Sequence, residues 1–382
     1  MTTSRFARRI AGTSLHSAGT IAAFLILSVL VGLGLFLPCN PDPGVGTPLS
    51  KKSYEANLES FQGLLDSDFS RVAASEDIDL TKREVAALER TVAASSTSEF
   101  IDAATEFFNL EIESAEHGYL ISDVRALSAQ RDYLLLFSEL EHPTLGYAST
   151  LEAPALYYAS SMIWTVPYLA FYLPVLAAVI TAAFYRRKGR LLSRAPVNPA
   201  CGFLVSAATG AAAAVASVVI AFTPSMLVCT VKNGFGDPAY PVMFEVGDTM
   251  RTTTLGASLA ESALLFVVLS IVLAVIAEFF FMISSSALLA GISAVVALAL
   301  PTLPFYSTVA MSPLGAYLPT TYLQVWSITG FASFIPEFSA CPIPGMSLPA
   351  ALISSIVLAV VLIGAGIALR ACIDKPKGGQ HA

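Results

Sequence analysis

The chain has 382 residues, of which 55% are hydrophobic and only 13% are charged, and its mean hydropathy is +0.69. This balance lies outside the range of soluble globular proteins and indicates that lipid solvates much of the surface. The net charge of -7 averages two regions, because most acidic residues lie between Asp42 and Glu152. The five cysteines form no CxxC or Cys/His pattern and no basic stripe is interleaved with aromatics, so neither a metal site nor a nucleic-acid partner is expected.

Apolar stretches long enough to cross a membrane recur along the chain. A crossing needs about 20 residues, since a helix rises about 1.5 Å per residue and the hydrocarbon layer is about 30 Å thick. The apolar stretch at 255–304 is too long for one crossing, and Ser284–Ser286 is the expected turn between two. We therefore predict an all-α membrane protein with six transmembrane helices. They are expected at residues 18–38, 158–185, 200–224, 255–281, 285–304 and 348–370.

The first apolar stretch is interpreted as an uncleaved anchor. Arg5, Arg8 and Arg9 precede it, as basic residues precede a secretory signal, but its apolar run is longer than that of a signal peptide. No small-residue cleavage site follows, and Pro38 stands where a lipoprotein signal needs a small residue. Residues 1–17 are expected to form a cytoplasmic amphipathic start, because Ser4 to Leu15 alternate basic and apolar side chains; this stretch either lies along the membrane surface or is a flexible basic tail.

Residues 39–157 are expected to form a helical domain outside the membrane, between the first two spans. Thr81 with Glu84, and Ser96 with Glu99, have the spacing of capping boxes and predict two helix starts. Apolar residues recur with helical spacing at Leu127, Tyr133 and Leu134. No catalytic constellation is present, so a solvated helical domain is the simplest interpretation.

Basic clusters indicate the orientation, because lysine and arginine in short loops are retained on the cytoplasmic side. Such clusters precede the first span, follow the second and follow the last, which agrees with an even number of spans. Both termini are therefore expected in the cytoplasm, the C-terminal one as a tail at 371–382. The outer loop at 225–254 has few basic residues and the segment 305–347 has none. Since 305–347 is rich in proline and aromatics, we expect a re-entrant region of short helices there.

The predicted cytoplasmic loop at 186–199 is short and strongly basic. Its cations are Arg186, Arg187, Lys188, Arg190 and Arg194. One interpretation is that they only mark the cytoplasmic side. The other is that they dock a cytoplasmic partner, since arginine makes bidentate contacts with carboxylates.

Two acidic residues fall within the predicted fourth span. Glu261 lies about one helical turn from its outer end, and Glu278 lies near its inner end. A carboxylate inside a membrane is costly, so each is a candidate residue of a transport pathway. The alternative is that Glu261 reaches interfacial water and that Glu278 lies at the cytoplasmic boundary.

Cys229 and Cys341 are both expected at the outer face, one after the third span and one before the sixth. A disulfide between them is one interpretation. Cys39 is expected outside as well, and a bridge requires a Cα separation of about 4.4 to 6.8 Å, so the sequence leaves the pairing open.

The order of these segments resembles that of the permease subunits of type-two ATP-binding-cassette (ABC) transporters, in the branch with a large extracytoplasmic domain after the first span. Two outer segments add to the resemblance. The segment 232–241 is similar to the Asn-Gly-x-Gly and Tyr-Pro signature of the turn after the third span. The segment 317–330 is similar to the motif of the re-entrant region. The matching residues are Asn233, Gly234, Gly236, Tyr240, Pro241, Tyr317, Pro319 and Tyr322. The loop at 186–199 is shorter than the family pattern and leaves room for only a short coupling helix.

The resemblance implies a permease subunit of an exporter in a bacterial cell membrane. Such a subunit pairs with a second copy or a homologous permease, and cytoplasmic ABC ATPase subunits dock on its inner loops. The sequence contains no GxxxxGK[ST] phosphate loop, so ATP and Mg are expected on the ATPase partner. The chain itself is expected to need no cofactor and to catalyse no reaction. Substrates of the class include peptides, lipids, drugs and polysaccharides, and nothing in the sequence chooses among them.

Two other function classes remain open at this point. One is a non-transporting membrane protein whose outer helical domain binds a ligand or partner, as a sensor or a component of the envelope. The other is a secondary transporter, which the sparse charge inside the spans and the lack of an internal repeat disfavour.

Overall fold

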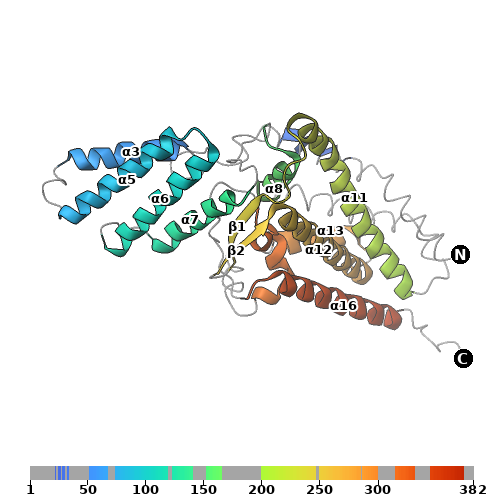
Figure 1. Cartoon of the computed structure of the whole chain (residues 1–382). Coiled ribbons are helices and arrows are strands. Elements are labelled where there is room, and N and C mark those ends of the chain that lie inside the picture. Colours follow the sequence, from blue (N-terminus) through green and yellow to red (C-terminus); the bar gives the residue numbers. More distant parts are fainter. Residues whose placement is uncertain are drawn as a thin grey trace, which may run out of the picture.

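The computed structural model describes residues 51–67, 74–118, 123–140, 152–165, 199–246, 249–284, 286–299, 315–331 and 345–373, with a few residues between 22 and 33. In this part of the chain a bundle of four helices lies at one end and a group of long apolar helices at the other (Figure 1). A two-stranded sheet lies between them.

The four-helix bundle corresponds to the predicted outer helical domain. Its helices are α3 (Lys51–Asp66), α5 (Ser75–Ala93), α6 (Thr97–Glu116) and α7 (Val124–Ser138). Tyr54 packs edge-on against Phe100, with ring centroids 5.4 Å apart, and against Phe107 at 6.0 Å. The predicted apolar positions of α7, Leu127, Tyr133 and Leu134, are buried. Burial of these aromatic and aliphatic side chains between amphipathic helices holds the bundle together.

One of the two predicted capping boxes is confirmed and the other is wrong. Ser96 accepts from the backbone N–H of Glu99, whose carboxylate accepts from the backbone N–H of Ser96 at 3.3 Å. Thr81 instead lies inside α5, where its hydroxyl donates to the carbonyl of Asp77 at 2.9 Å. The side chain of Glu84 is turned into the bundle and is 1% exposed. A threonine and a glutamate three residues apart therefore need not mark a helix start, because inside a helix the threonine hydroxyl can bond to a carbonyl of the preceding turn.

Within the described residues, three helices are long and apolar enough to cross a membrane. They are α11 (Pro199–Asn233), α12 (Leu255–Ser284) and α16 (Leu348–Ile373), with candidate spans at Phe203–Asn233, Leu255–Ser284 and Leu348–Leu369. These match the predicted third, fourth and sixth spans. The helix α11 continues through Pro224, the predicted end of the third span, as far as Asn233. Pro224 removes one backbone donor without ending the helix.

Parts of the other predicted spans are described. The helix α8 (Ala155–Thr165) covers the start of the predicted second span, and α13 (Ala287–Ala299) covers most of the predicted fifth. The chain turns between α12 and α13 at Ser284–Ser286, as predicted. The rest of the second and fifth spans, most of the first span, the loop at 186–199 and both terminal segments lie outside the described residues.

A β-hairpin lies where the sequence predicted only an outer loop. Strands β1 (Pro241–Val246) and β2 (Thr249–Thr254) pair antiparallel, with Phe244 opposite Arg251. The described part of the chain is mostly helical, as predicted, and this hairpin is a short addition in which alternating side chains contact different neighbours on the two faces. The predicted re-entrant region contains short helical turns, η2 (Gly315–Tyr317), η3 (Pro319–Leu323) and α15 (Trp326–Thr329).

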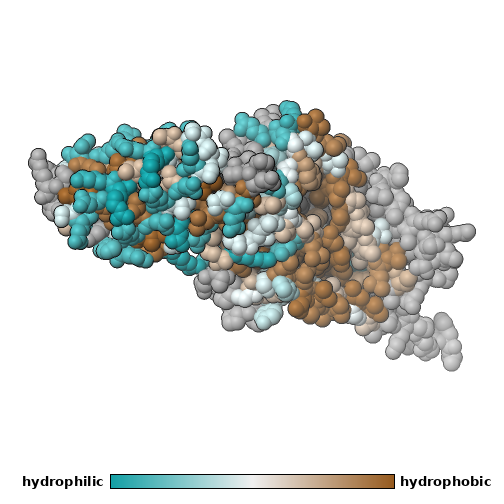
Figure 2. Space-filling view, viewed as in Figure 1, coloured by the Kyte–Doolittle hydropathy of each residue, from teal (hydrophilic) through white to brown (hydrophobic). Residues whose placement is uncertain are grey.

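The surface divides in the way expected of an integral membrane protein. Hydrophilic residues cover the bundle, and hydrophobic residues cover the long helices (Figure 2). On α16, Val357, Val360 and Val361 are 56%, 62% and 58% exposed. Contiguous apolar surface of this kind is stable in hydrocarbon and not in water. The protein is therefore an integral membrane protein.

Candidate functional site

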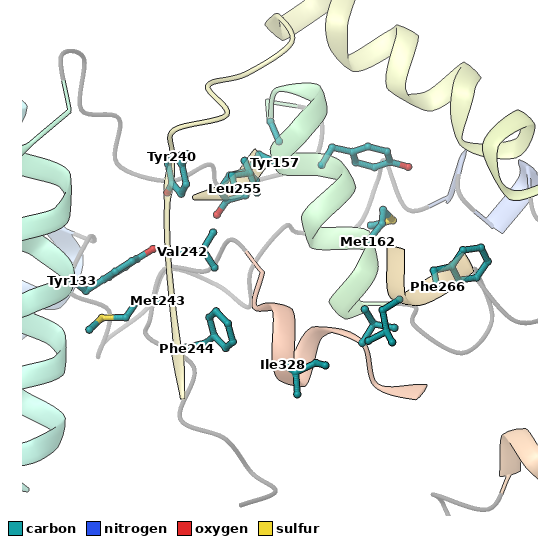
Figure 3. Packing of buried hydrophobic residues seen from close by; sticks show 14 of the residues in the cluster. Tyr133, Tyr157, Met162, Tyr240, Val242, Met243, Phe244, Leu255, Phe266 and Ile328 are labelled. Carbon is teal, nitrogen blue, oxygen red and sulfur yellow. The ribbon is translucent and has the colours of Figure 1, made fainter. Parts of the chain in front are cut away.

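Strand β1 and the residue before it connect the helical bundle to the apolar helices, and one face of the strand is turned toward the bundle. Tyr240, just before the strand, packs edge-on between Phe137 of α7 and Tyr157 of α8, with centroid separations of 5.3 and 5.4 Å. Arg125 at the start of α7 forms an ion pair with Glu245 of β1. In Figure 3, Tyr133 and Met243 lie between the bundle and the strand. Aromatic packing and the ion pair therefore fix α7 against β1.

The other face of β1, away from the bundle, contacts the described segment 315–331, which lies in the predicted re-entrant region. Val242 and Phe244 point away from the bundle, toward α15 and Ile328 (Figure 3). Gly330, directly after α15, has φ of +73°, and a Cβ there would lie 2.4 Å from Cδ1 of Phe244 and 2.8 Å from Cγ1 of Val242. Only glycine fits both this backbone conformation and this close approach.

The helix α12 forms hydrogen bonds with α15 and with Gly330, the residue that follows α15. Ser258 donates to the carbonyl of Gly330 at 3.0 Å, and the hydroxyls of Ser262 and Thr329 lie 2.7 Å apart. Thr329 donates its single hydroxyl hydrogen to the carbonyl of Val325 at 3.1 Å, so Ser262 is the donor to Thr329. These buried bonds attach α15 to the first two turns of α12.

The contacts among β1, α12 and α15 form a junction between the bundle and the long helices. An ion pair at the edge of this junction involves one of the predicted pathway residues. Nη2 of Arg251 lies 3.0 and 3.3 Å from the two carboxylate oxygens of Glu261. Nη1 of Arg251 donates to the carbonyl of Ile328 at 3.4 Å, and the guanidinium lies 5.8 Å from the ring centroid of Phe244. Glu261 thus links β2 to α12, with its charge balanced by arginine.

The other predicted pathway residue, Glu278, is 7% exposed between the long helices. Ser206 of α11 donates to its Oε2 at 3.1 Å. Glu261 and Glu278 are separated by about 25 Å along α12, since a helix rises about 1.5 Å per residue. The structure therefore does not bring the two carboxylates together, and each has its own polar neighbours.

The segment 232–241 forms hydrogen bonds with residues at the start of α8. The side-chain amide of Asn233 donates to the carbonyl of Ala153 at 3.0 Å, and the backbone N–H of Ala155 donates to the carbonyl of Gly234 at 3.2 Å. Gly236 has φ of +97°, and a Cβ there would lie 2.9 Å from Cβ of Pro154. Tyr240 is buried and Pro241 opens β1. These residues shape the turn between the end of α11 and the hairpin.

The segment 317–330 folds over the same junction. The hydroxyl of Tyr322 donates to the carbonyl of Ala316 at 2.6 Å, and Pro319 is buried beside it. Tyr317, in contrast, is 68% exposed. The packing of Gly330 on Val242 and Phe244 brings this segment against the strand that follows the segment 232–241.

A large apolar cavity lies beside the junction. Its volume is about 700 Å³, and its walls come from α8, α11 and the first part of α12, with residues of the re-entrant region at one side. Ile163, Phe222 and Phe266 are among its walls, and Thr223, Thr230 and Ser262 are its polar lining residues. Its size is typical of small-molecule sites, which measure about 300 to 1,000 Å³.

The remaining predicted site residues are only partly described. The basic loop residues Arg186 to Arg194 and Cys341 lie outside the described residues. Cys229 is buried, and because Cys341 is not described, the pairing of these two cysteines stays a prediction. Within the described ranges, no group of three or more His, Cys, Asp or Glu side chains is placed to hold a metal ion.

Two residues of these contacts, Ser258 and Thr329, were not predicted from the sequence, whereas Gly330 closes the segment 317–330 that the resemblance had singled out. The signal of Ser258 and Thr329 is weak, because a single hydroxyl residue in or beside an apolar helix is common. Arg251 carried a clearer signal, since it and Lys232 are the only basic residues of the predicted outer loop. A lone cation beside an apolar span needs a partner, and Glu261 is the nearest acidic residue along the next helix.

Comparison of the chain with protein-family models, with curated protein sequences and with solved structures found no match.

Proposed function

We propose that this chain is the membrane-spanning permease subunit of an ATP-driven ABC transporter, working as an exporter. The observation that carries the proposal is the junction at β1. Both outer segments that resemble the type-two permeases, 232–241 and 317–330, adjoin this strand although they are far apart in the sequence. The first segment ends at Pro241, which begins β1, and Gly330 of the second packs against Val242 and Phe244 of β1. Residues of both matching segments therefore lie at or next to β1.

The junction also suits a protein that changes conformation. The ring packing of Tyr240 and the ion pair of Arg125 with Glu245 connect the bundle to β1, while Ser258 and Ser262 connect α12 to the re-entrant region. A displacement of α12 would therefore be passed to the outer bundle through contiguous packed elements. A transporter needs such a connection between its spanning helices and the part of the chain that faces substrate or partner.

The energy source in this proposal is a separate subunit. The chain has no phosphate loop, so ATP and Mg would be bound by cytoplasmic ABC ATPase subunits that dock on the loop at 186–199. Six spans would place both termini and this loop in the cytoplasm and the bundle outside a bacterial cell membrane. A second copy, or a homologous permease, would complete the transporter.

The test is copurification of an ATPase with the tagged chain from its native membrane. We expect the wild-type chain to bring down a protein that contains a phosphate loop, together with ATP hydrolysis. Replacing Arg187 and Arg190 by alanine should abolish copurification, because bidentate contacts with partner carboxylates are lost. The matched control replaces Arg8 and Arg9, which are basic and cytoplasmic in the same topology but precede the first span.

The outcomes separate the proposed function from the alternatives. Loss of the ATPase in the loop variant alone, with normal membrane insertion, supports docking at 186–199. Wild-type copurification in both variants would reduce the basic loop to a topology signal. Absence of any ATPase from the wild-type preparation would favour a sensor or envelope protein whose outer bundle binds a ligand.

A further inference from the structure

We propose that the cavity between α8, α11 and α12 binds a hydrocarbon chain of a membrane lipid, which enters sideways from the leaflet next to the helical bundle. The binding itself does not depend on what the protein does. A second part of the inference rests on the proposed permease function. If the chain is that permease, its substrates are amphipathic molecules with a long apolar chain.

The first argument is the chemistry of the walls. Of the eighteen described residues that line the cavity, fifteen are apolar and none is charged. The other three, Thr223, Thr230 and Ser262, each carry one hydroxyl. Transfer of a polar ligand into such surroundings is costly unless its hydrogen bonds are replaced, whereas a hydrocarbon chain gains from the same walls.

The second argument is that the three hydroxyls already use their hydrogens within the protein. Thr223 donates to the carbonyl of Val219 and Thr230 to that of Met226, each at 2.7 Å. Ser262 donates to Thr329 at 2.7 Å, as the bond from Thr329 to Val325 requires. The described part of the walls therefore presents no hydroxyl hydrogen to a sugar or a peptide.

The third argument is the position of the cavity. Its α12 residues lie between Leu259 and Val267, and its α11 residues between Val215 and Thr230, so it occupies the part of both helices next to the hairpin. Val219 and Leu227 line the cavity and are also 59% exposed each. In the view of Figure 2, hydrophobic residues cover the long helices. Because lining residues such as Val219 and Leu227 are part of the apolar surface of α11, an apolar chain can reach the cavity sideways from the lipid that surrounds these helices.

Water is a poor occupant of this space. A buried water molecule typically makes about three hydrogen bonds, and an apolar cavity offers too few partners for that. Among the possible occupants, acyl chains are the ones present at high concentration at this surface. The cavity therefore favours a hydrocarbon chain over solvent.

The test is photolabelling of the purified full-length chain in nanodiscs of phosphatidylcholine. A small fraction of the lipid is replaced by phosphatidylcholine with a diazirine on one acyl chain, and labelled residues are located by mass spectrometry. Ala263→Trp fills the cavity from α12, and Ala159→Phe fills it from α8. The matched control is Ala212→Trp, because Ala212 is exposed on α11 but does not line the cavity.

We expect labelling within the cavity walls of the wild type and of Ala212→Trp, and a drop of at least tenfold in both filling variants, with labelling of α16 unchanged. Equal labelling of the walls in all four proteins would overturn the proposal. So would wild-type labelling confined to α16, which would mean that protein, and not lipid, occupies the space. Because no ATPase is present, these results stand apart from copurification, and either can fail while the other succeeds.

Discussion

Replacing Glu84 by glutamine should change how the stability of the helical bundle depends on pH. Glu84 is 1% exposed, and its Oε1 has no hydrogen-bond partner. Burial, and to a lesser extent the nearby Glu111, raise the pKa of Glu84 from its ordinary 4.5 to about 8, against a smaller lowering by the hydroxyl of Ser114. Burial also raises the pKa of Glu111 to about 7. Near neutral pH, Glu84 is therefore kept largely protonated in the fold.

The sign and size of the effect follow from these pKa values. A raised folded-state pKa means that the fold binds the proton more tightly than the unfolded chain does. The contribution of Glu84 to the free energy of unfolding is therefore fully present below about pH 4.5 and is lost as pH rises toward 8. A rise from 4.5 to about 8 corresponds to a loss of roughly 5 kcal/mol, of which about 3 kcal/mol falls below pH 7. Glutamine has no proton to lose, so the variant should lack the part of this dependence that comes from Glu84.

The assay is hydrogen exchange of the full-length protein in detergent, read at the amides of α5 and α6 and corrected for the intrinsic pH dependence of exchange. The opening free energy of the wild type should fall between pH 4.5 and 8. It should fall much less in Glu84→Gln, which should be the more stable protein at pH 8. Glu89→Gln is the control, since Glu89 is an exposed carboxylate on the same helix. A wild-type pH profile in Glu84→Gln, or a profile in the wild type that rises with pH, would refute the reasoning.

Three further substitutions have expected outcomes. Gly330→Ala should destabilise the protein by about 2 kcal/mol or more, because its Cβ would lie 2.4 Å from Phe244 at a positive φ; an unchanged Tm in detergent would contradict this. Ser96→Ala should cost about 1 kcal/mol by removing the capping box, seen as faster exchange in the first turn of α6, and unaltered exchange there would argue against the cap. Glu261→Gln should change stability by less than about 1 kcal/mol, because its pair with Arg251 is partly exposed, yet should lower substrate-stimulated ATPase activity of the reconstituted complex. Wild-type ATPase activity in that variant would remove Glu261 from the pathway.

Length and local pattern were sufficient to predict several elements. The apolar stretch at 255–304 exceeds one crossing, and the polar cluster at Ser284–Ser286 does separate α12 from α13. Ser96 and Glu99 predicted a helix start correctly because the signal is complete within four residues. Thr81 and Glu84 have similar spacing, but the helix begins earlier, and only tertiary packing shows that Glu84 belongs to the core.

The candidate site depended on contacts between distant segments. The hairpin could not be found from periodicity, because Phe244 packs on Gly330 while Met243 faces the bundle, so both faces of β1 are covered. The cavity is a space between three helices and leaves no pattern in any one of them. Glu261 was recognised as a costly charge, but its partner Arg251 became evident only when the hairpin placed β2 beside α12.

Native mass spectrometry of the tagged chain, purified from its own membrane, tests the permease assignment most directly. The account predicts an assembly in which two permease chains, at least one of them this 40.2 kDa chain, are bound to two ATPase subunits that contain a phosphate loop. Addition of ATP and Mg to that assembly should give hydrolysis. An assembly that contains only copies of this chain, with no phosphate-loop subunit and no ATP hydrolysis, would contradict the account.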